Sequence, residues 1–506
     1  MRIIGYHISS NGIIANSDGE YTDKLPYLEF LLAPKPDSIR VFYYLAQNIA
    51  SLAKIIKMTP SEVGKLHNGA HGKCYMSPYK IQYIPNRFLQ IQKGFYKNNP
   101  FAYFYDAHQY QDTRAGLNND LQNCFLRAQV AKDIGEQVRN ALNELGLHLK
   151  SLSSPVSLFD KEVISKIDLP VDSDIPEEAG LFAYECCKGN WLEAFQIGHW
   201  DKVWDYDISS AYPSQIANLL DIRQGKWMES KEFMQEATYG YCKGRVTIDA
   251  EFSPIMYKQD RNRVSGLFPI LHTPIGSWET YLTKQEIEFI GRWGLGRFEI
   301  ESGWWWIQDK NTLRPLHSVI NWLYLEKEKA DGIKKDVIKR IMAGIYGRML
   351  ETRDGELGKR FNSVWAAEIE TNNRLEVADF VLRNRATKHL IHIAVDGVVM
   401  DSPIELVGNG IGSWKLSNIS PCICEGTGQV ALRDNGKGDF HLHYDWLREA
   451  IEKEPEQSEY TMRSMRPVTL AEAVNGQWGK LGELQEVKKY ISVGNTDKRC
   501  YKERPK

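Results

Sequence analysis

Alternating apolar and polar residues predict a strand in the segment KVWDYDISSAYP, which begins at residue 202. Asp205 and Asp207 share one face of this strand, and the intervening aromatic residues form the other. The strand is expected to stop at Ser209 and Ser210, because Pro213 blocks a simple continuation. An aspartate at a strand end, followed by backbone amides and a tyrosine, suits a divalent metal and the phosphates that it binds. Strand-end aspartates are also common turn residues, so the segment alone does not settle a function.

A second strand pattern occurs far downstream, in LIHIAVDGVVMDS from Leu390 to Ser402. The pair Asp396 and Gly397 between two runs rich in Ile and Val predicts a β-hairpin, because Asp-Gly supplies the positive φ that such turns need. Asp396 is therefore expected at a hairpin tip. An isolated Asp-Gly pair more often serves turn chemistry alone, and that alternative stays open at this point.

Two helices are predicted between these strands, from about Pro315 to Lys329 and through IKKDVIKRIMAGIYGRML. One face of the second helix gathers two lysines a turn apart, a small residue, a tyrosine and a glycine: Lys335, Lys339, Ala343, Tyr346 and Gly347. Such a face could bind a triphosphate and pack on a base pair. A plain surface helix would also carry lysines.

Composition sets wide limits. The 506 residues are 42% hydrophobic and 25% charged, which is ordinary for a globular chain, and a net charge of −2 means that any nucleic-acid surface must be local. The eight cysteines form no CxxC pair, so a zinc module is not expected and reduced thiols are. No apolar run reaches membrane-spanning length. The adjacent Trp304, Trp305 and Trp306 are expected to serve both faces of a sheet rather than to stack on bases.

The two aspartate segments together resemble motifs A and C of family B DNA polymerases, usually Asp-x-x-Ser-Leu-Tyr-Pro-Ser and Tyr-x-Asp-Thr-Asp-Ser. This chain has DISSAYPS and IAVDGV at these places. Asp207 and Tyr212 match motif A. Asp396 matches the later aspartate of motif C, while Ala394 replaces the earlier one and Gly397 replaces the serine.

The helix KRIMAGIYG resembles motif B, usually Lys-x-x-x-Asn-Ser-x-Tyr-Gly. Lys339, Tyr346 and Gly347 match, whereas Ala343 and Gly344 replace Asn-Ser, which puts fidelity in doubt more than activity. Two further segments resemble DNA-contacting motifs of the family. These are AYECCKGNWLEAFQIG, with Gly189, Asn190 and Trp191, and AAEIETNNRLEV, with Arg374 and with Glu370 where threonine is usual. For Trp191, a core position is an equally open alternative to stacking on a base.

The resemblance implies a mixed α/β, multidomain right-hand polymerase. The expected parts are a ribonuclease H-like exonuclease-type domain over 1–180, a palm over 181–309 and 351–405, fingers over 310–350 and a thumb over 406–506. The closing segment is locally basic, and DNA contacts are expected from Lys488, Lys489, Lys498 and Arg499. A solvated basic terminus is the alternative.

Family B proofreading needs a carboxylate cluster that binds two metals. The expected acids fall on IGYHISS, on the region near Gln47 and on Cys124 to Ala128, and none of these places holds an acid. Three independent absences predict a domain without 3′→5′ exonuclease activity, which would act as a scaffold or a single-strand guide.

The resemblance further implies template-directed DNA synthesis from a primer–template and deoxynucleotides. Asp207, Asp396 and the Ile208 carbonyl would hold two Mg²⁺ ions, for which Mn²⁺ could substitute. Lys339 and Lys335 would neutralise the triphosphate, and the sugar and base would meet the segment Ile208, Ser209, Ser210, Ala211 and Tyr212 together with Tyr346 and Gly347. Tyr212 would exclude ribonucleotides.

Partners beyond DNA and nucleotides would be a protein primer or accessory replication proteins, without a membrane. A cytoplasmic location and a phage, plasmid or mobile-element origin are implied. Two other function classes stay open: a template-independent or protein-primed nucleotidyl transferase, and a catalytically idle DNA-binding scaffold.

Overall fold

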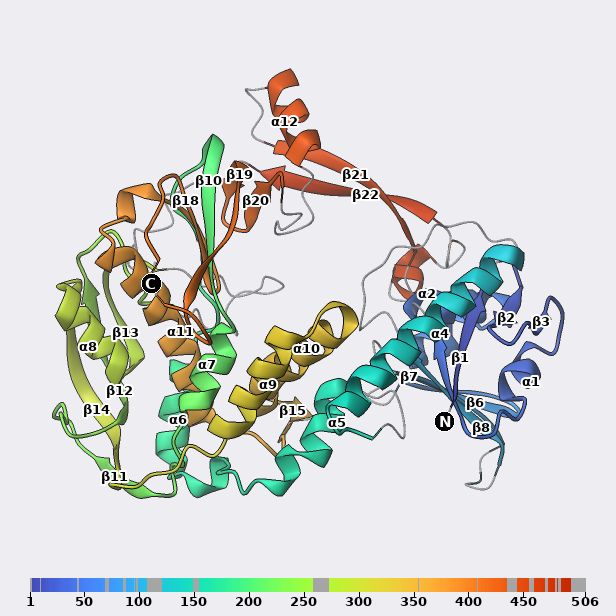
Figure 1. The fold of residues 1–506 in the computed structure, drawn as a ribbon, viewed down its shortest axis with the longest axis horizontal. Coiled ribbons are helices and arrows are strands. Elements are labelled where there is room, and N and C mark those ends of the chain that lie inside the picture. The colour runs from blue at the N-terminus through green and yellow to red at the C-terminus, as the bar shows by residue number, and fades with distance from the viewer. Residues whose placement is uncertain are drawn as a thin grey trace. The chain divides into compact units, whose positions relative to one another are not determined.

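The computed structural model describes most of the chain, namely residues 2–9, 11–42, 45–68, 72–84, 88–94, 96, 99–106, 121–148, 154–257, 273–353, 355–406, 408–434, 444–454, 459–468, 472–477, 480 and 484–492. The chain divides into two compact units (Figure 1). Unit 1 comprises Met1–Lys166, Leu325–Met342 and Arg463–Lys488, and unit 2 comprises Ile167–Tyr324, Ala343–Met462 and Lys489–Lys506. The predicted mixed α/β fold class is confirmed.

Unit 1 is built on an eight-stranded mixed sheet with the order β3-β2-β1-β4-β8-β7-β6-β5. The central strands β1, β4 and β8 are parallel, and β5 to β8 form an antiparallel meander. The strands are β1 (Arg2–Ile8), β2 (Ile14–Asn16), β3 (Tyr21–Thr22), β4 (Ser38–Phe42), β5 (Lys73–Met76), β6 (Tyr79–Ile84), β7 (Phe88–Lys93) and β8 (Phe101–Asp106).

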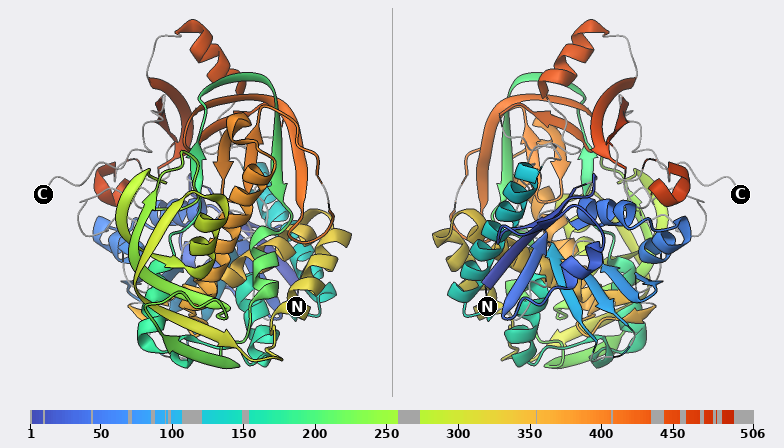
Figure 2. Two further views of the ribbon diagram at one scale, coloured as in Figure 1. Left: turned by 90° about the vertical axis from the view of Figure 1, so that its left-hand side faces the viewer. Right: turned by 90° about the vertical axis from the view of Figure 1, so that its right-hand side faces the viewer.

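Helices pack on both faces of this sheet. The long α4 (Leu121–Glu144) lies directly on β1, where a Cβ on Gly5 would come within 1.7 Å of the Ala128 carbonyl oxygen, so only glycine fits there. The opposite face carries an apolar core that includes residues of α1 (Tyr27–Leu32), α2 (Leu45–Ile55) and α3 (Pro60–Asn68). Figure 2, right, shows the blue strands with α4 in cyan.

Unit 2 is built on a six-stranded antiparallel sheet with the order β20-β19-β10-β18-β17-β9. Its strands are β9 (Leu192–Ala194), β10 (Gly198–Ile208), β17 (Leu390–Ala394), β18 (Gly397–Met400), β19 (Trp414–Gly426) and β20 (Gln429–Leu432). The helix α11 (Ser363–Arg383) shares the apolar core of this sheet, since Phe380 stacks on Trp414 and packs on Tyr206. The helices α6 (Glu177–Cys186) and α7 (Ala211–Asn218) both pack on α11.

A second antiparallel sheet of unit 2 has the order β11-β14-β12-β13 (Figure 2, left). It consists of β11 (Gly225–Glu229), β12 (Tyr239–Ile248), β13 (Gly276–Thr283) and β14 (Gly296–Gln308). The helix α8 (Lys284–Trp293) lies between β13 and β14 in the chain. Trp305 and Trp306 lie on β14 and are fully buried. The structural role predicted for the three tryptophans is thus confirmed for these two.

Two helices follow β14, α9 (His317–Lys329) and α10 (Gly332–Met349), close to the predicted bounds. The remaining elements are α5 (Pro155–Glu162), a short β15 (Thr352–Arg353) and β16 (Glu356–Leu357) hairpin, α12 (Tyr444–Lys453), and the paired strands β21 (Glu459–Pro467) and β22 (Leu484–Ser492). Within the described residues, no helix is long and apolar enough to cross a membrane, and the cysteines there form no disulfide.

Two of the expected domain limits differ from the structure. The thumb was expected from residue 406, but β19 pairs with β10 and β20 pairs with β19 in one sheet. Cys422 and Cys424 of β19 share an apolar cluster with Val203 of β10. The N-terminal domain was expected to reach residue 180, but the N-terminal segment of unit 1 ends at Lys166. The helix α6 packs on elements of unit 2.

Candidate active site

The motif A segment folds as a strand, a turn and a helix. The strand β10 ends at Ile208, and Ser210 adopts a left-handed conformation with φ of 54° before α7 begins. The turn is held in place from outside, since the Ser209 amide donates to the Ser413 carbonyl (2.9 Å) and the Gly412 amide donates to the Ser209 carbonyl (2.7 Å). Pro213 lies in the first helical turn, where the missing N–H costs nothing. The predicted strand end at Ser209 and Ser210 is confirmed.

The motif C segment is a hairpin of β17 and β18 with a tight turn, as expected. The turn residues are Val395 and Asp396, one position earlier than the Asp-Gly pair suggested, and Val395 rather than Gly397 has the positive φ (60°). A β-branched residue in this region is strained. The neighbours hold it there, because the Val395 amide donates to the Trp191 carbonyl (2.8 Å) and the Asn373 side chain donates to the Val395 carbonyl (3.0 Å).

The sheet brings the two predicted catalytic aspartates together. Asp207 on β10 is in register with Gly397 on β18, the residue next to Asp396. The Ile208 amide donates to the Asp396 carbonyl at 3.0 Å, which ties the end of β10 to the hairpin tip. A Cβ on Gly397 would lie 3.8 Å from Asp207 Oδ1, so glycine leaves room beside this carboxylate. The two acids are 189 positions apart in the sequence and neighbours across two adjacent strands.

Sequence reasoning missed a lysine at the same place. Lys415 on β19 is in register with Asp207 on its other side, and its Nζ lies 3.3 Å from Asp207 Oδ2. The pair is partly exposed to water, so it adds little to stability. Its position shows that the carboxylate of Asp207 can hold a cation. No sequence signal indicated this contact, because it depends on which strand lies next to β10.

The oxygen donors suit Mg²⁺, which prefers carboxylates and carbonyls and usually completes its shell with water and substrate phosphates. Asp207 and Asp396 supply two carboxylates, and Ile208 supplies a nearby backbone carbonyl. Among the residues that the structure describes, no group of three or more His, Cys, Asp or Glu side chains could hold a metal. Asp207, Asp396 and the Ile208 carbonyl would therefore suit a metal whose remaining ligands are water and substrate phosphates.

Two tyrosines from motifs A and B lie beside each other. The rings of Tyr212 and Tyr346 meet edge to face, with centroids 4.9 Å apart. The Tyr212 hydroxyl donates to the Asn190 side-chain oxygen, and the Tyr346 hydroxyl donates to the carboxylate of Glu370. Burial, together with the charge of Glu370, raises the pKa of both phenols far above the usual value, so both stay protonated donors.

Glu370 also fixes the segment that contains Gly189, Asn190 and Trp191, called the linker from here on. Its second carboxylate oxygen accepts a hydrogen bond from the Gly189 amide at 2.6 Å, while Arg374 Nη1 donates to the Gly189 carbonyl at 3.1 Å. Arg374 in turn lies 3.0 Å from Glu286, which is fully buried at the start of α8. Burial raises the pKa of Glu286, but nearby Lys188 and Arg374 outweigh it and hold this pKa below the usual value.

Two expected DNA contacts need correction. The side chains of Trp191 and Arg374 are each 1% exposed, so neither can touch DNA directly in this structure. Trp191 packs on Phe195 and Phe252, which is the core position that the sequence left open. Arg374 is buried because its guanidinium donates hydrogen bonds both to Glu286 and to the Gly189 carbonyl. Asn190 is the exposed member of the linker set.

The predicted face of α10 is its outward face. Lys339, Ala343 and Gly347 are exposed, whereas Val337, Ile338, Ile341, Met342 and Ile345 are buried. Lys339 makes a long contact with Asp336 (3.9 Å) and its side chain is 57% exposed, so its ammonium group is accessible. Of the basic C-terminal residues, Lys488 is exposed on β22. The side chain of Lys489 and all of Lys498 and Arg499 lie outside the described residues.

The place where proofreading acids were expected holds other groups. His7 at the end of β1 lies 3.2 Å from Arg127 Nη1 of α4, and burial plus this arginine lower the His7 pKa to about 3. The Asn48 side chain accepts from the Ile8 amide (2.6 Å). Asp106 at the end of β8, which sequence reasoning missed, accepts from the Leu45 amide (3.3 Å). A buried arginine beside a neutral histidine disfavours divalent cations.

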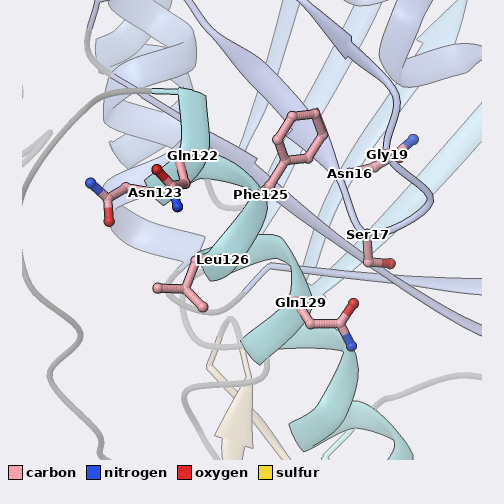
Figure 3. A pocket seen from close by; sticks show the side chains of 8 residues that line it. All are labelled: Asn16, Ser17, Gly19, Gln122, Asn123, Phe125, Leu126 and Gln129. Atoms are coloured by element: carbon pink, nitrogen blue, oxygen red, sulfur yellow. The ribbon is translucent and has the colours of Figure 1, made fainter.

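A surface pocket of about 470 Å³ lies in unit 1 between the turn after β2 and the first turns of α4 (Figure 3). It is lined by Asn16, Ser17, Gly19, Gln122, Asn123, Phe125, Leu126 and Gln129. This lining contains amides, the Ser17 hydroxyl and apolar groups, but no carboxylate, imidazole or thiol. The pocket therefore offers no general acid or base that could activate the Ser17 hydroxyl.

The likeness of this chain to known proteins agrees with that geometry. No model of a known protein family matches it. A DNA polymerase of Acidianus bottle-shaped virus (isolate Italy/Pozzuoli) is 24% identical over 274 residues, which are 49% of this chain and 38% of that protein's length.

Solved structures match over nearly the whole chain. Phi29 DNA polymerase, complexed with primer-template DNA and incoming nucleotide, has a TM-score of 0.65 at 11% identity, with 97% of this chain and 99% of that chain covered. Its orthorhombic crystal form has a TM-score of 0.63 at 11% identity, with 98% and 100% covered. The chain therefore has the right-hand fold of phi29 DNA polymerase and is similar over about half of its length to a viral DNA polymerase, in line with the resemblance of its motifs to family B.

Proposed function

We propose that the protein is a DNA-directed DNA polymerase that adds deoxynucleotides to a primer 3′ end and does not proofread. The observation that carries this proposal is the register of β10 against β18, which sets Asp207 beside the Asp396 hairpin tip. A strand-end carboxylate beside a hairpin carboxylate, on this fold, is a suitable arrangement for nucleotidyl transfer.

Asp207, Asp396 and the Ile208 carbonyl would hold two Mg²⁺ ions, or Mn²⁺ in their place. When bound, the metal would lower the pKa of the primer 3′-hydroxyl and stabilise the departing pyrophosphate. The carboxylates orient the reacting groups, and the start of α7 offers the backbone amides of Ala211 and Tyr212 to an anion. The segment from Ser209 to Tyr212 would thus meet the triphosphate and the sugar.

The remaining nucleotide contacts come from motifs A and B. The accessible ammonium of Lys339, supported by Lys335 one turn earlier, would neutralise the triphosphate. The ring of Tyr212, braced by Tyr346, would crowd a 2′-hydroxyl and favour deoxynucleotides. The exposed Gly347 adds no side chain beside Tyr346, so a base pair could approach the helix closely.

DNA itself would be contacted by exposed polar and basic groups. Asn190 and Lys488 are accessible for this role, and Lys489, Lys498 and Arg499 are proposed from the sequence alone. Arg374 and Trp191 would act indirectly, by holding the linker in place. The lack of proofreading is supported by Arg127 beside His7 where metal-binding acids would be needed.

Extension of a labelled primer in the presence of Mg²⁺ tests this function. Asp207→Ala and Asp396→Ala should each abolish extension, whereas Asp401→Asn, at the far end of β18 and paired with His389, should leave it intact. Omission of the template should stop synthesis, and template-independent products would favour the transferase alternative. The same labelled strand should not shorten. Normal extension by either aspartate variant would contradict the proposal.

A further inference from the structure

The sheet of unit 1 has one face that is only partly covered by helices. On the core face, alternate residues such as Ile81, Leu89 and Phe104 are buried in the cluster that includes α1, α2 and α3. On the other face, α4 lies over β1, β2 and β4. The strands β5 to β8 continue the sheet beyond that helix, and their outward residues are partly or fully accessible over most of their length.

Aromatic side chains dominate β8, the strand of this surface that lies next to β4. Phe101, Tyr103 and Tyr105 alternate along β8 with the buried Ala102 and Phe104, so all three point outward. Phe101 is 55% exposed and Tyr103 is 36% exposed. Successive ring centroids are 5.7 and 6.4 Å apart, which makes a row of rings along the strand.

The row extends across the neighbouring strands. Phe88 on β7 packs edge to face on Tyr103, with centroids 5.5 Å apart. On β5, Tyr75 is 55% exposed and, through Lys80 and Gln92, is in register with Phe101. Large exposed apolar rings on a sheet face are unusual without a ligand or partner, because they gain nothing from contact with water.

The polar residues of the same face are cationic or neutral. Lys73 on β5 pairs in register with Gln82 on β6, which pairs with Gln90 on β7, which pairs with Tyr103. Lys80 on β6 faces outward between Tyr75 and Gln92. None of the outward positions of these four strands is Asp or Glu. The face therefore combines stacking rings, amides and lysines without an opposing charge.

We propose that this surface, the aromatic face of β5 to β8, binds single-stranded nucleic acid. Unpaired bases can stack on the rings, the amides can hydrogen-bond to base edges, and the lysines can attract phosphates. A protein partner would also bury aromatic rings, but it would not require every charged residue of the face to be basic. A duplex is a poor fit, because its bases are already stacked on each other.

This proposal goes beyond the polymerase function and does not depend on it. The aromatic face lies in unit 1, whereas the proposed catalytic aspartates lie in unit 2. A strand held on this face would be single-stranded template or product. Failure of primer extension would therefore say nothing about the aromatic face, and loss of strand binding here would leave the proposed chemistry standing.

Fluorescence anisotropy with fluorescein-labelled oligo(dT) tests the proposal on the full chain, with unlabelled primer–template duplex present to occupy the polymerase site. Phe101→Ala and Tyr103→Ala should each weaken binding by about 5-fold or more, because stacking of one base on one ring contributes about 1 kcal/mol or more to the binding free energy. Tyr21→Ala is the matched control, because Tyr21 is an exposed tyrosine at the opposite edge of the same sheet and should leave binding unchanged.

Two further measurements remove ambiguity. Lys73→Ala and Lys80→Ala should each lower the slope of log affinity against log salt by about 0.7, as expected for one lost phosphate contact with a single strand. Photo-crosslinking of an iodouracil-substituted oligonucleotide should label peptides of β5 to β8. The proposal would be overturned if Phe101→Ala and Tyr103→Ala fold normally and keep the wild-type affinity for oligo(dT), and if the crosslinks are confined to other peptides.

Discussion

Tyr346 of motif B donates its hydroxyl hydrogen to Glu370 of α11, and the same carboxylate accepts the amide hydrogen of Gly189 in the linker. One side chain thus joins the helix that would carry the nucleotide to the segment that precedes the palm sheet. Where family B polymerases usually have threonine, this chain has a charged group that accepts both hydrogen bonds. Hydrogen bonds to an ionised carboxylate are stronger than neutral ones, so this contact should fix the ring of Tyr346.

Glu370→Gln should therefore impair nucleotide binding more than chemistry. The neutral amide accepts a weaker hydrogen bond from Tyr346. It also has only one acceptor oxygen, so its NH₂ group would replace the oxygen that serves either Tyr346 or Gly189. A hydrogen bond to a charged group contributes about 1.5–3 kcal/mol, so KM for the incoming deoxynucleotide should rise about 10-fold or more while kcat changes less. Steady-state single-nucleotide incorporation measures both constants.

Tyr346→Phe supplies the control for that experiment. If Glu370 acts through the Tyr346 hydroxyl, the double variant should be no worse than the more affected single variant. Glu376→Gln, on the same helix but bonded to Trp414, should leave KM unchanged. A fall in kcat together with a lower free energy of unfolding in Glu370→Gln, without a rise in KM, would instead indicate a purely structural role.

Tyr212→Ala should relax the choice of sugar. The Tyr212 ring rests on Tyr346 and its hydroxyl is held by Asn190, so its position is fixed from two sides. Removal of the ring opens space for a 2′-hydroxyl, and the ratio of kcat/KM for deoxy- over ribonucleotides should fall by about 10-fold or more. Tyr212→Phe keeps the ring and should retain most of the discrimination. An unchanged ratio in Tyr212→Ala would assign sugar selection to another residue.

The part of the site that could be predicted from sequence depends on local patterns. A strand that ends in Asp207 and a turn signal at Asp396 are both short-range features, and each was placed within one residue of its observed position. Lys415 could not be found in this way, because its contact with Asp207 requires β19 to lie beside β10. Strand neighbours are set by tertiary packing and not by alternation within a strand.

Glu370 and Arg374 were hidden for a different reason. The helix α11 is buried nearly all round, so apolar residues do not mark one face and its polar residues show no inward direction. A basic residue in a motif that usually contacts the template suggested exposure, yet Arg374 is inside because Glu286 is also buried and needs a partner. Such a pair of buried charges depends on tertiary packing, which brings α8 and α11 together.

Trp191→Ala should lower stability rather than affect DNA binding alone. The indole packs on Phe195 and Phe252 and donates to Glu193 at 2.8 Å, so alanine leaves a cavity and removes one of the hydrogen bonds to this carboxylate. Loss of a buried tryptophan costs about 3–5 kcal/mol. Thermal unfolding should show a clear fall in Tm, whereas Leu357→Ala, at an exposed position, should change it little. A normal Tm with weakened DNA binding would restore the stacking role.

A buried acid in α11 predicts a dependence of stability on pH. Burial raises the pKa of Glu368 to about 8, although hydrogen bonds from Tyr241 (2.8 Å) and Asn372 (3.5 Å) oppose this, and the charge of nearby Glu286 adds to it. The folded state therefore keeps a proton that the unfolded chain releases near its ordinary pKa of 4.5. This contribution to stability is complete below that value and is lost as pH rises through about 8.

Glu368→Gln should remove that dependence, because the amide is neutral at every pH and has nearly the same shape. Wild type and variant should unfold at similar temperatures near pH 5. Between there and pH 8 each pH unit costs the wild type about 1.4 kcal/mol, so the variant should become the more stable protein in mild base. Differential scanning calorimetry across this range gives both curves. Parallel curves would mean that Glu368 is ionised in the folded protein, with a cation beside it.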